Sequence, residues 1–239
     1  MFLRLTSLPP PRSWRHLVPN LMTCLALAAG MTAMRLALLG DWRESISFIV
    51  AAAGLDALDG PAARLLRVDS RFGAQLDSLS DLVCFGIAPA CLAWRWALTD
   101  SGIWGWACAL IFGVAAALRL ARFNSAGERN AASTKTRDFV GVPTPAGAGL
   151  AMMPLFASFG LGIATAGQSV AIGIWLIVVA LLMVSRLRTV SLAGAARRYG
   201  AMSWLVLAAL AIGGFIAPWS VLFTLGCFYM LTLAVRPAP

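Results

Sequence analysis

Long apolar segments joined by short polar connections dominate this 239-residue chain. A helix advances about 1.5 Å per residue and needs about 20 mostly apolar residues to cross the hydrocarbon core of a membrane. Hydrophobic residues make up 60% of the sequence and charged residues 12%, and the mean hydropathy is +0.81. This composition excludes a soluble domain and a disordered chain, and it indicates a polytopic membrane protein.

We expect an all-α fold with about eight transmembrane helices. The candidate segments are residues 19–39, 45–66, 73–94, 103–121, 144–165, 168–185, 201–216 and 219–235. The last two are short, and Gly213, Gly214 and Pro218 lie between them. One broken helical hairpin or a re-entrant segment is therefore an alternative for this part of the chain.

The net charge of +9 raises the question of a nucleic-acid partner. The basic residues are not gathered into one tract with interleaved aromatic residues, so we expect no nucleic acid. Their positions instead depend on the side of the membrane on which each connection would lie. If the N-terminus is cytoplasmic, only Arg35, Arg43 and Arg95 of the 19 Lys and Arg residues fall on outer flanks. The positive-inside rule therefore favours a cytoplasmic N-terminus, and an even number of spans returns the C-terminus to the same side.

The chain is expected to form one membrane domain. Residues 1–18 are a basic, Pro-rich cytoplasmic segment, equally consistent with a stretch that rests on anionic headgroups and with a disordered tail. The apolar run that follows is too long for a signal-peptide core, so we interpret it as a first transmembrane helix. Residues 125–138 have the composition of a mobile cytoplasmic loop. With no internal repeat in view, residues 19–239 are predicted to be a single transmembrane domain.

Four aspartates interrupt the second and third apolar segments. They lie in residues 56–81, which read DALDGPAARLLRVDSRFGAQLDSLSD. An ionised Asp at membrane depth costs about 2.5 to 3.5 kcal/mol even on a lenient insertion scale, so strong partners are needed. Clustered carboxylates usually bind a hard divalent cation such as Mg²⁺ or Mn²⁺.

Helical periodicity predicts that these carboxylates meet. At about 100° per residue, Asp56 and Asp59 point to one side of the second helix. Asp77 and Asp81 are one turn apart on the third helix, and the connection RVDSR makes the two helices antiparallel neighbours. Two carboxylate stripes can then face each other and share cations. Taken without any relative, the pattern favours a catalytic metal site and a transport path about equally.

The spacing of this segment is DxxDGxxARx8Gx3Dx3D, which resembles the signature of the CDP-alcohol phosphotransferase family at every fixed position. The fixed positions are Asp56, Asp59, Gly60, Ala63, Arg64, Gly73, Asp77 and Asp81. RLARFN at residues 119–124 and FVGVPTPAGAG at 139–149 are similar to the phosphatidylserine synthase branch of that family. The resemblance implies a six-helix family core, and an enzyme that transfers the phosphatidyl group of CDP-diacylglycerol to the hydroxyl of L-serine, giving phosphatidylserine and CMP.

The resemblance also implies roles for individual residues. Two divalent ions, Mg²⁺ or Mn²⁺, would be held by Asp56, Asp59, Asp77 and Asp81. Asp81 would in addition be the general base that takes the hydroxyl proton. The nucleotide site would include Asp56, Gly60, Ala63, Arg64 and Gly73. The acceptor site would include Arg119, Arg122, Asn124 and Thr144.

Two other interpretations stay open at this point. A sibling enzyme would share the metal chemistry and use glycerol 3-phosphate, inositol phosphate or choline as acceptor. A transporter with a carboxylate relay would be expected to show inverted repeats and paired broken helices, and we find none in corresponding halves of the sequence. For the enzyme we expect the inner membrane of a bacterium, with the active site facing the cytoplasm, and relatives imply a homodimer.

Overall fold

The computed structural model describes residues 17–66, 70–130, 141–163, 167–185 and 216–234, and the regular elements in these ranges are all helical. The predicted all-α class is therefore confirmed for the described part. Residues 1–16, the connection at 186–200 and all but one residue of the predicted span 201–216 lie outside it.

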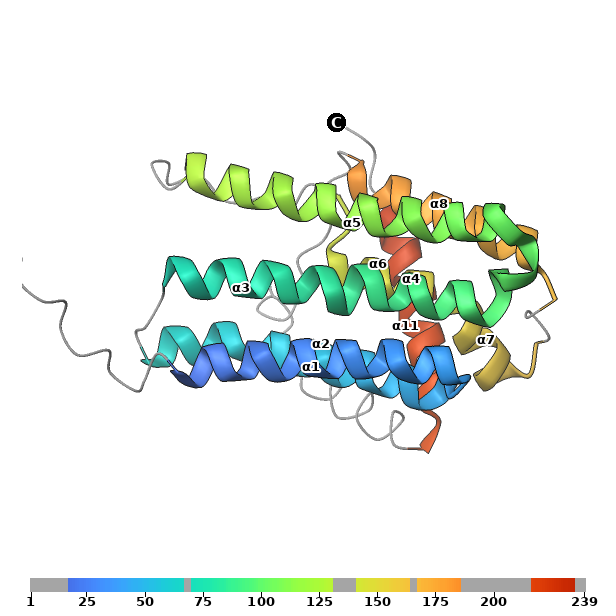
Figure 1. Cartoon of the computed structure of the whole chain (residues 1–239), viewed down its shortest axis with the longest axis horizontal. Coiled ribbons are helices and arrows are strands. Elements are labelled where there is room, and N and C mark those ends of the chain that lie inside the picture. The colour runs from blue at the N-terminus through green and yellow to red at the C-terminus, as the bar shows by residue number, and fades with distance from the viewer. Residues whose placement is uncertain (1–16, 67–69, 131–140, 164–166, 186–215, 235–239) are drawn as a thin grey trace, which may run out of the picture.

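Helices α1 (Leu17–Leu39) and α2 (Trp42–Leu66) form a long antiparallel pair (Figure 1). The chain reverses between them at Gly40, whose φ of 89° is a conformation that residues with a side chain rarely adopt. Near the reversal, the buried hydroxyl of Ser45 donates to the carbonyl oxygen of Ala33 at 2.8 Å, which ties the start of α2 to α1. Ser45 and Ala33 are both small, which lets the two backbones approach closely at this contact.

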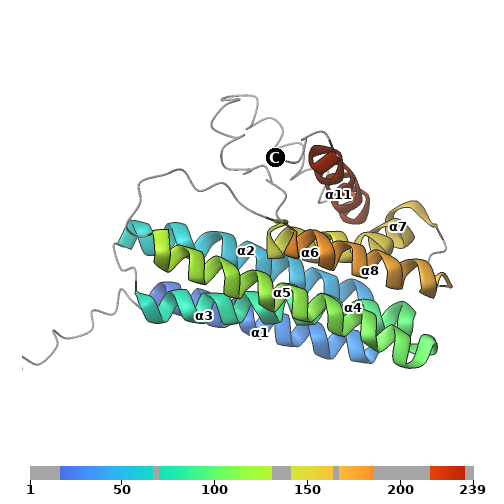
Figure 2. The same ribbon diagram turned by 90° about the horizontal axis from the view of Figure 1, so that it is seen from above.

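Helix α3 (Arg71–Asp81), a π-helical turn (Leu82–Ile87) and α4 (Ala88–Ala93) continue as one rod that packs against α1 (Figures 1 and 2). The rod begins at Ser70, whose Oγ accepts a hydrogen bond from the backbone N–H of Gly73 at 3.0 Å. This cap satisfies a donor that the first helical turn would leave unpaired.

The rod continues through Trp94–Leu98 and Thr99–Ser101 into α5 (Gly102–Asn130). The whole helical stretch Phe72–Ser125 has 54 residues, and a straight helix of that length would be about 80 Å long, far more than one crossing needs. Gly102, with a φ of 57°, marks the reversal, and α5 runs back beside α4 (Figure 1). The two predicted spans at 73–94 and 103–121 correspond to the two arms of this stretch.

Helices α6 (Thr144–Ala151) and α7 (Met153–Leu161) were predicted as one span, but they are bent by 48°. Pro154 lies in the first turn of α7, where it has no N–H to continue the hydrogen bonds of α6. Helix α8 (Ser169–Val184) packs against α5, and α11 (Pro218–Ala234) packs against α7 (Figure 2).

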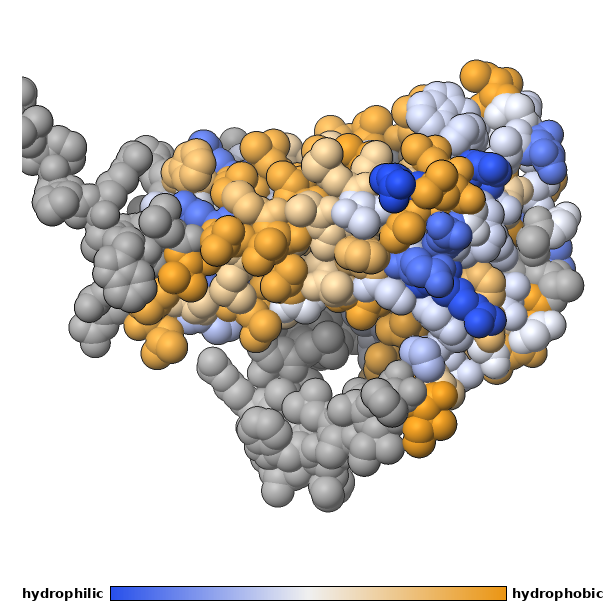
Figure 3. Space-filling view, turned by 60° about the horizontal axis from the view of Figure 1, so that its bottom comes forward, coloured by the Kyte–Doolittle hydropathy of each residue, from blue (hydrophilic) through white to orange (hydrophobic). Residues whose placement is uncertain are grey.

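Three described helical stretches are long and apolar enough to cross a membrane, and α6 with α7 makes a fourth if the bent pair is one span. Helices α8 and α11 are apolar but shorter, with 16 and 17 residues. Apolar side chains cover most of the described surface on the face in Figure 3, and hydrophilic ones gather toward one end. The described part is thus a multi-pass membrane protein, while the count of eight spans stays a prediction.

Candidate metal centre

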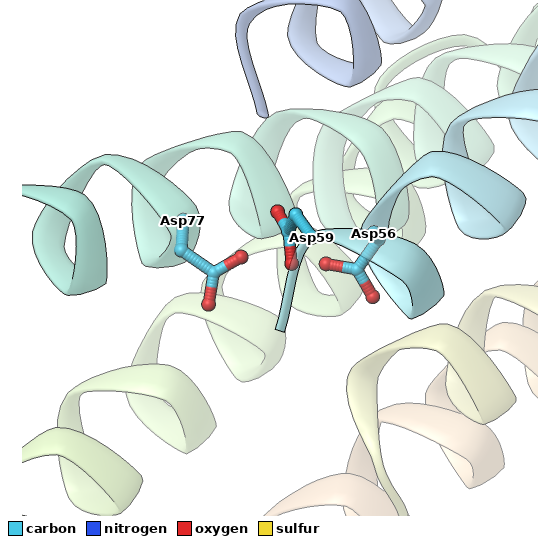
Figure 4. A group of neighbouring side chains, drawn as sticks. All are labelled: Asp56, Asp59 and Asp77. Atoms are coloured by element: carbon cyan, nitrogen blue, oxygen red, sulfur yellow. The ribbon is translucent and has the colours of Figure 1, made fainter. Parts of the chain in front are cut away.

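Three of the four motif aspartates meet between α2 and α3 (Figure 4). Asp56 and Asp59 come from α2 and Asp77 comes from α3, and one carboxylate oxygen from each lies within 4.8 Å of the others. Asp59 is buried with 8% of its surface exposed, and the other two are half-buried. The helical spacing that predicted two facing stripes therefore does bring these carboxylates together.

Asp81 lies one helical turn beyond Asp77, beside this cluster rather than within it. The Asp56 carboxyl lies close enough to both the Asp77 and the Asp81 carboxyls to interact with them. Among the described residues, the buried Oδ1 of Asp81 has no hydrogen-bond partner. It is therefore placed to accept a proton or to share in binding a cation held by its neighbours.

The chemistry of the cluster fits a hard divalent cation. Its members are carboxylates, which are the ligands that Mg²⁺ and Mn²⁺ prefer. Like charges this close repel one another, and burial removes the water that would weaken the repulsion. A cation bound between Asp56, Asp59 and Asp77 would remove that repulsion. The residues present thus fit the metal that the sequence analysis expects.

A cavity of about 220 Å³ opens next to the cluster, between α1, α2 and the start of α3. Its lining residues are Pro19, Asn20, Thr23, Asp59, Gly60, Ala63, Arg64, Ser70, Gly73, Ala74 and Asp77. All predicted nucleotide residues except Asp56 are among them. A Cβ atom on Gly73 would lie 3.1 Å from both Asn20 Oδ1 and Ser70 Oγ, so a side chain there would crowd the cavity wall.

The α1 residues of this lining were missed by the sequence analysis. Asn20 and Thr23 are polar, lie three positions apart in an apolar helix, and therefore share one face. That spacing is the signal that could have pointed to them. Their contribution means that the site is built by three helices rather than two.

The predicted acceptor residues divide into two groups. Arg119 on α5 donates from Nη1 to the buried hydroxyl of Thr144 at the start of α6, and its charge acts on Asp81. Arg119 Nε is buried and has no hydrogen-bond partner in the described part of the chain. Arg119 and Thr144 therefore belong to the side of the site where Asp81 lies.

Asn124 and Arg122 make other contacts. Asn124 donates from Nδ2 to Ser78 Oγ at 3.0 Å, so it joins α5 to α3 next to Asp77. Arg122 is exposed and donates from Nη1 to the carbonyl oxygen of Val184 at 2.8 Å. That carbonyl is at the C-terminal end of α8, where a cation is favourable.

Similarity to known proteins identifies the family of this chain. The sequence profile of the CDP-alcohol phosphatidyltransferase family matches residues 16–235. A CDP-diacylglycerol–serine O-phosphatidyltransferase of Mycobacterium leprae is 35% identical over 229 residues, which cover 92% of this chain and 75% of the relative. Proteins of the same name from Mycobacterium tuberculosis and Bacillus subtilis are each 34% identical, over 92% and 64% of this chain and 79% and 84% of the relatives. The chain belongs to the CDP-alcohol phosphatidyltransferase family.

Proposed function

We propose that this protein transfers the phosphatidyl group of CDP-diacylglycerol to the hydroxyl of L-serine, producing phosphatidylserine and CMP. The observation that carries the proposal is the meeting of Asp56, Asp59 and Asp77 beside Asp81, within a membrane-embedded fold. Relatives that share this reaction name align with nearly the whole chain. Membership of an enzyme family argues against the transporter.

We propose that the three-aspartate cluster holds divalent cations, two ions of Mg²⁺ or Mn²⁺, with Asp81 near the second. Bound there, the ions would neutralise the diphosphate and stabilise the departing CMP. The protein's part is to hold the carboxylates from two helices at a fixed separation. Asp59 is the least exposed of the three, so protein atoms rather than water surround its side chain.

The cavity between α1, α2 and α3 is our candidate for the nucleotide site. Arg64 is exposed at its edge and offers a planar fork for phosphate or for the cytosine edge. Gly73 in the first turn of α3 brings no side chain into the cavity, so a phosphate can approach the N-terminus of this helix, which favours negative charge. Gly60, Ala63 and Asp56 complete the predicted set.

On the other side of the cluster we propose the serine site. Asp81 would take the proton of the serine hydroxyl, whose oxygen then bonds to the phosphorus next to diacylglycerol while the bond from that phosphorus to CMP breaks. Arg119 would hold the serine carboxylate by charge-assisted hydrogen bonds, and Thr144 would keep the guanidinium in place. Arg122 and Asn124, on the same end of α5, stay candidates for the edge of this site.

We further propose that the site opens to the cytoplasmic side of a bacterial inner membrane and that the enzyme is a homodimer. The distribution of basic residues supports the orientation, since the outer flanks hold few of them. The dimer rests on the family alone.

The decisive experiment is an acceptor comparison with purified protein. CDP-diacylglycerol, Mg²⁺ or Mn²⁺, and each of L-serine, glycerol 3-phosphate, inositol phosphate and choline are incubated separately, and CMP and the lipid product are measured. We expect CMP and phosphatidylserine with serine, only when metal is present, and neither from Asp77→Asn. A faster reaction with glycerol 3-phosphate than with serine would indicate the sibling activity instead of the proposed one. No CMP from any acceptor would refute the transferase.

A further inference from the structure

We infer that Thr23 on α1 positions the metal ligand Asp59 and so makes α1 a working part of the metal centre. The inference rests on the proposed function for the metal role of Asp59. Thr23 lies outside the spaced motif, which draws on α2 and α3. It contributes no ligand and acts through another residue.

The contact between the two side chains is direct. Thr23 Oγ1 lies 2.9 Å from Asp59 Oδ2, and both residues are buried, with 4% and 8% of their surfaces exposed. An ionised carboxylate can only accept a hydrogen bond, so the hydroxyl is the donor. The same hydroxyl lies 3.1 Å from the carbonyl oxygen of Pro19, but a bond to a charged acceptor is the stronger of the two.

Asp59 needs such a partner because the last torsion of an Asp side chain is soft. Rotation about it is broad and nearly two-fold, so packing alone fixes the carboxylate plane poorly. A hydrogen bond to Oδ2 selects one orientation. Partners of this kind typically change metal affinity or activity by about 10- to 100-fold when removed.

Thr23 is itself held in place by the third helix. Ser80 on α3, the neighbour of Asp81 in sequence, lies with its hydroxyl 3.3 Å from the carbonyl oxygen of Thr23 and donates to it. One turn further along both helices, Cys84 Sγ donates to the carbonyl oxygen of Ala26 at 3.1 Å. The backbone of α1 is thereby fixed against the helix that carries Asp77, while the Thr23 side chain fixes a ligand on α2.

The same helix offers a matched control. Thr32 Oγ1 donates to the carbonyl oxygen of Ala28 at 2.8 Å, and this carbonyl stands four residues earlier in the helix, as that of Pro19 does for Thr23. Its hydrogen bond is exposed and within its own helix. Replacing Thr32 therefore removes a threonine hydroxyl from the same helix without removing a contact to a carboxylate.

The test compares Thr23→Val, Thr23→Ser and Thr32→Val in the full-length protein in detergent. Valine keeps the branched shape and removes the hydroxyl, and serine keeps the hydroxyl. Titration calorimetry with Mn²⁺ alone should show an affinity about 10- to 100-fold lower for Thr23→Val. Thr23→Ser should recover most of that loss, and Thr32→Val should match the wild type. The Mn²⁺ concentration for half-maximal CMP release should shift in parallel with the affinity.

Three outcomes would overturn the inference. The first is wild-type Mn²⁺ affinity in Thr23→Val. The second is a higher KM for CDP-diacylglycerol with unchanged metal affinity, which would make Thr23 a substrate contact, since it also lines the cavity. The third is additive losses in the Thr23→Val, Asp59→Asn double variant, because residues that act through one contact are not additive.

The test can be interpreted even if one variant does not fold or if serine is not the acceptor. If Thr23→Val does not fold, Thr23→Ala and Thr23→Ser are compared instead, and equal affinity in those two would refute a role for the hydroxyl. Metal calorimetry needs no acceptor, so the result stands even if serine is not the substrate. Failure of the wild type to bind Mn²⁺ would instead refute the metal centre itself.

Discussion

The guanidinium of Arg119 on α5 donates a hydrogen bond to the buried hydroxyl of Thr144, which begins α6. The contact holds an Arg side chain at one edge of the aspartate cluster, where its charge acts on Asp81. Arg122, one turn further along α5, instead bonds the C-terminal end of α8. Two arginines that look alike in sequence therefore have different surroundings.

This difference predicts that replacing each arginine by lysine has a different effect on the KM for serine. Arg119→Lys should raise the KM for serine about 10- to 100-fold, because a charge-assisted hydrogen bond contributes about 1.5 to 3 kcal/mol and Lys lacks the planar fork. The KM for CDP-diacylglycerol should change little. Arg122→Lys should leave the serine KM near the wild-type value and lower the thermal stability slightly. Unchanged serine KM in both variants would move the acceptor site away from α5.

The variant Asp81→Asn distinguishes a general-base role of Asp81 from a role as a metal ligand. Asparagine keeps the volume of the side chain and cannot take a proton, so kcat should fall about 10²- to 10⁴-fold. Mn²⁺ binding, measured by calorimetry, should persist because Asp56, Asp59 and Asp77 remain. If metal binding disappears with turnover, Asp81 is chiefly a ligand and the base is another group.

Gly73→Ala tests the nucleotide cavity. The added Cβ would lie 3.1 Å from Asn20 Oδ1 and Ser70 Oγ, so one wall must shift. Overpacking of this kind costs about 1 to 3 kcal/mol, and where that cost falls on nucleotide binding the KM for CDP-diacylglycerol rises about 5- to 160-fold. Gly54→Ala on α2 is the control, because nothing lies within 4 Å of its added Cβ. Equal KM values in the two variants would argue against nucleotide binding in this cavity.

Orientation is checked by labelling introduced cysteines in intact cells with a membrane-impermeant maleimide. Asp41 directly precedes α2 and Ser70 caps the start of α3; both are exposed, and the predicted orientation puts them on opposite sides of the membrane. Asp41→Cys should react from outside, and Ser70→Cys should react only after the membrane is permeabilised. Wild-type protein controls for the native cysteines. The reverse pattern would place the active site on the outer face.

The meeting of Asp56, Asp59 and Asp77 could be predicted from sequence because it follows from helical period and a short connection. Both are local properties. The hydrogen bond from Thr23 to Asp59 joins residues 36 positions apart, and no period along one helix reports a partner on another. The bond from Arg122 to Val184 spans 62 positions and was missed for the same reason.

Spans were predicted well where a helix is continuous and less well where it bends. The α1 and α2 pair agrees with the apolar segments at 19–39 and 45–66. The span predicted at 144–165 is broken at Met152. Hydropathy did not predict this break, because it counts apolar side chains and is insensitive to the backbone geometry ahead of Pro154. The predicted N-terminal segment and the seventh span fall largely outside the described residues.

The π-helical turn that follows Asp81 has a consequence for the membrane as a whole. It rotates the residues beyond Asp81 out of the acidic stripe, and the next positions along the rod are apolar and buried, with Phe85 at 2%, Ala88 at 1% and Leu92 at 0% exposure. Asp81 is thus the floor of the polar region. The apolar packing beyond Asp81 would oppose the passage of ions and protons, so the charge concentrated at the site would not make the protein a leak.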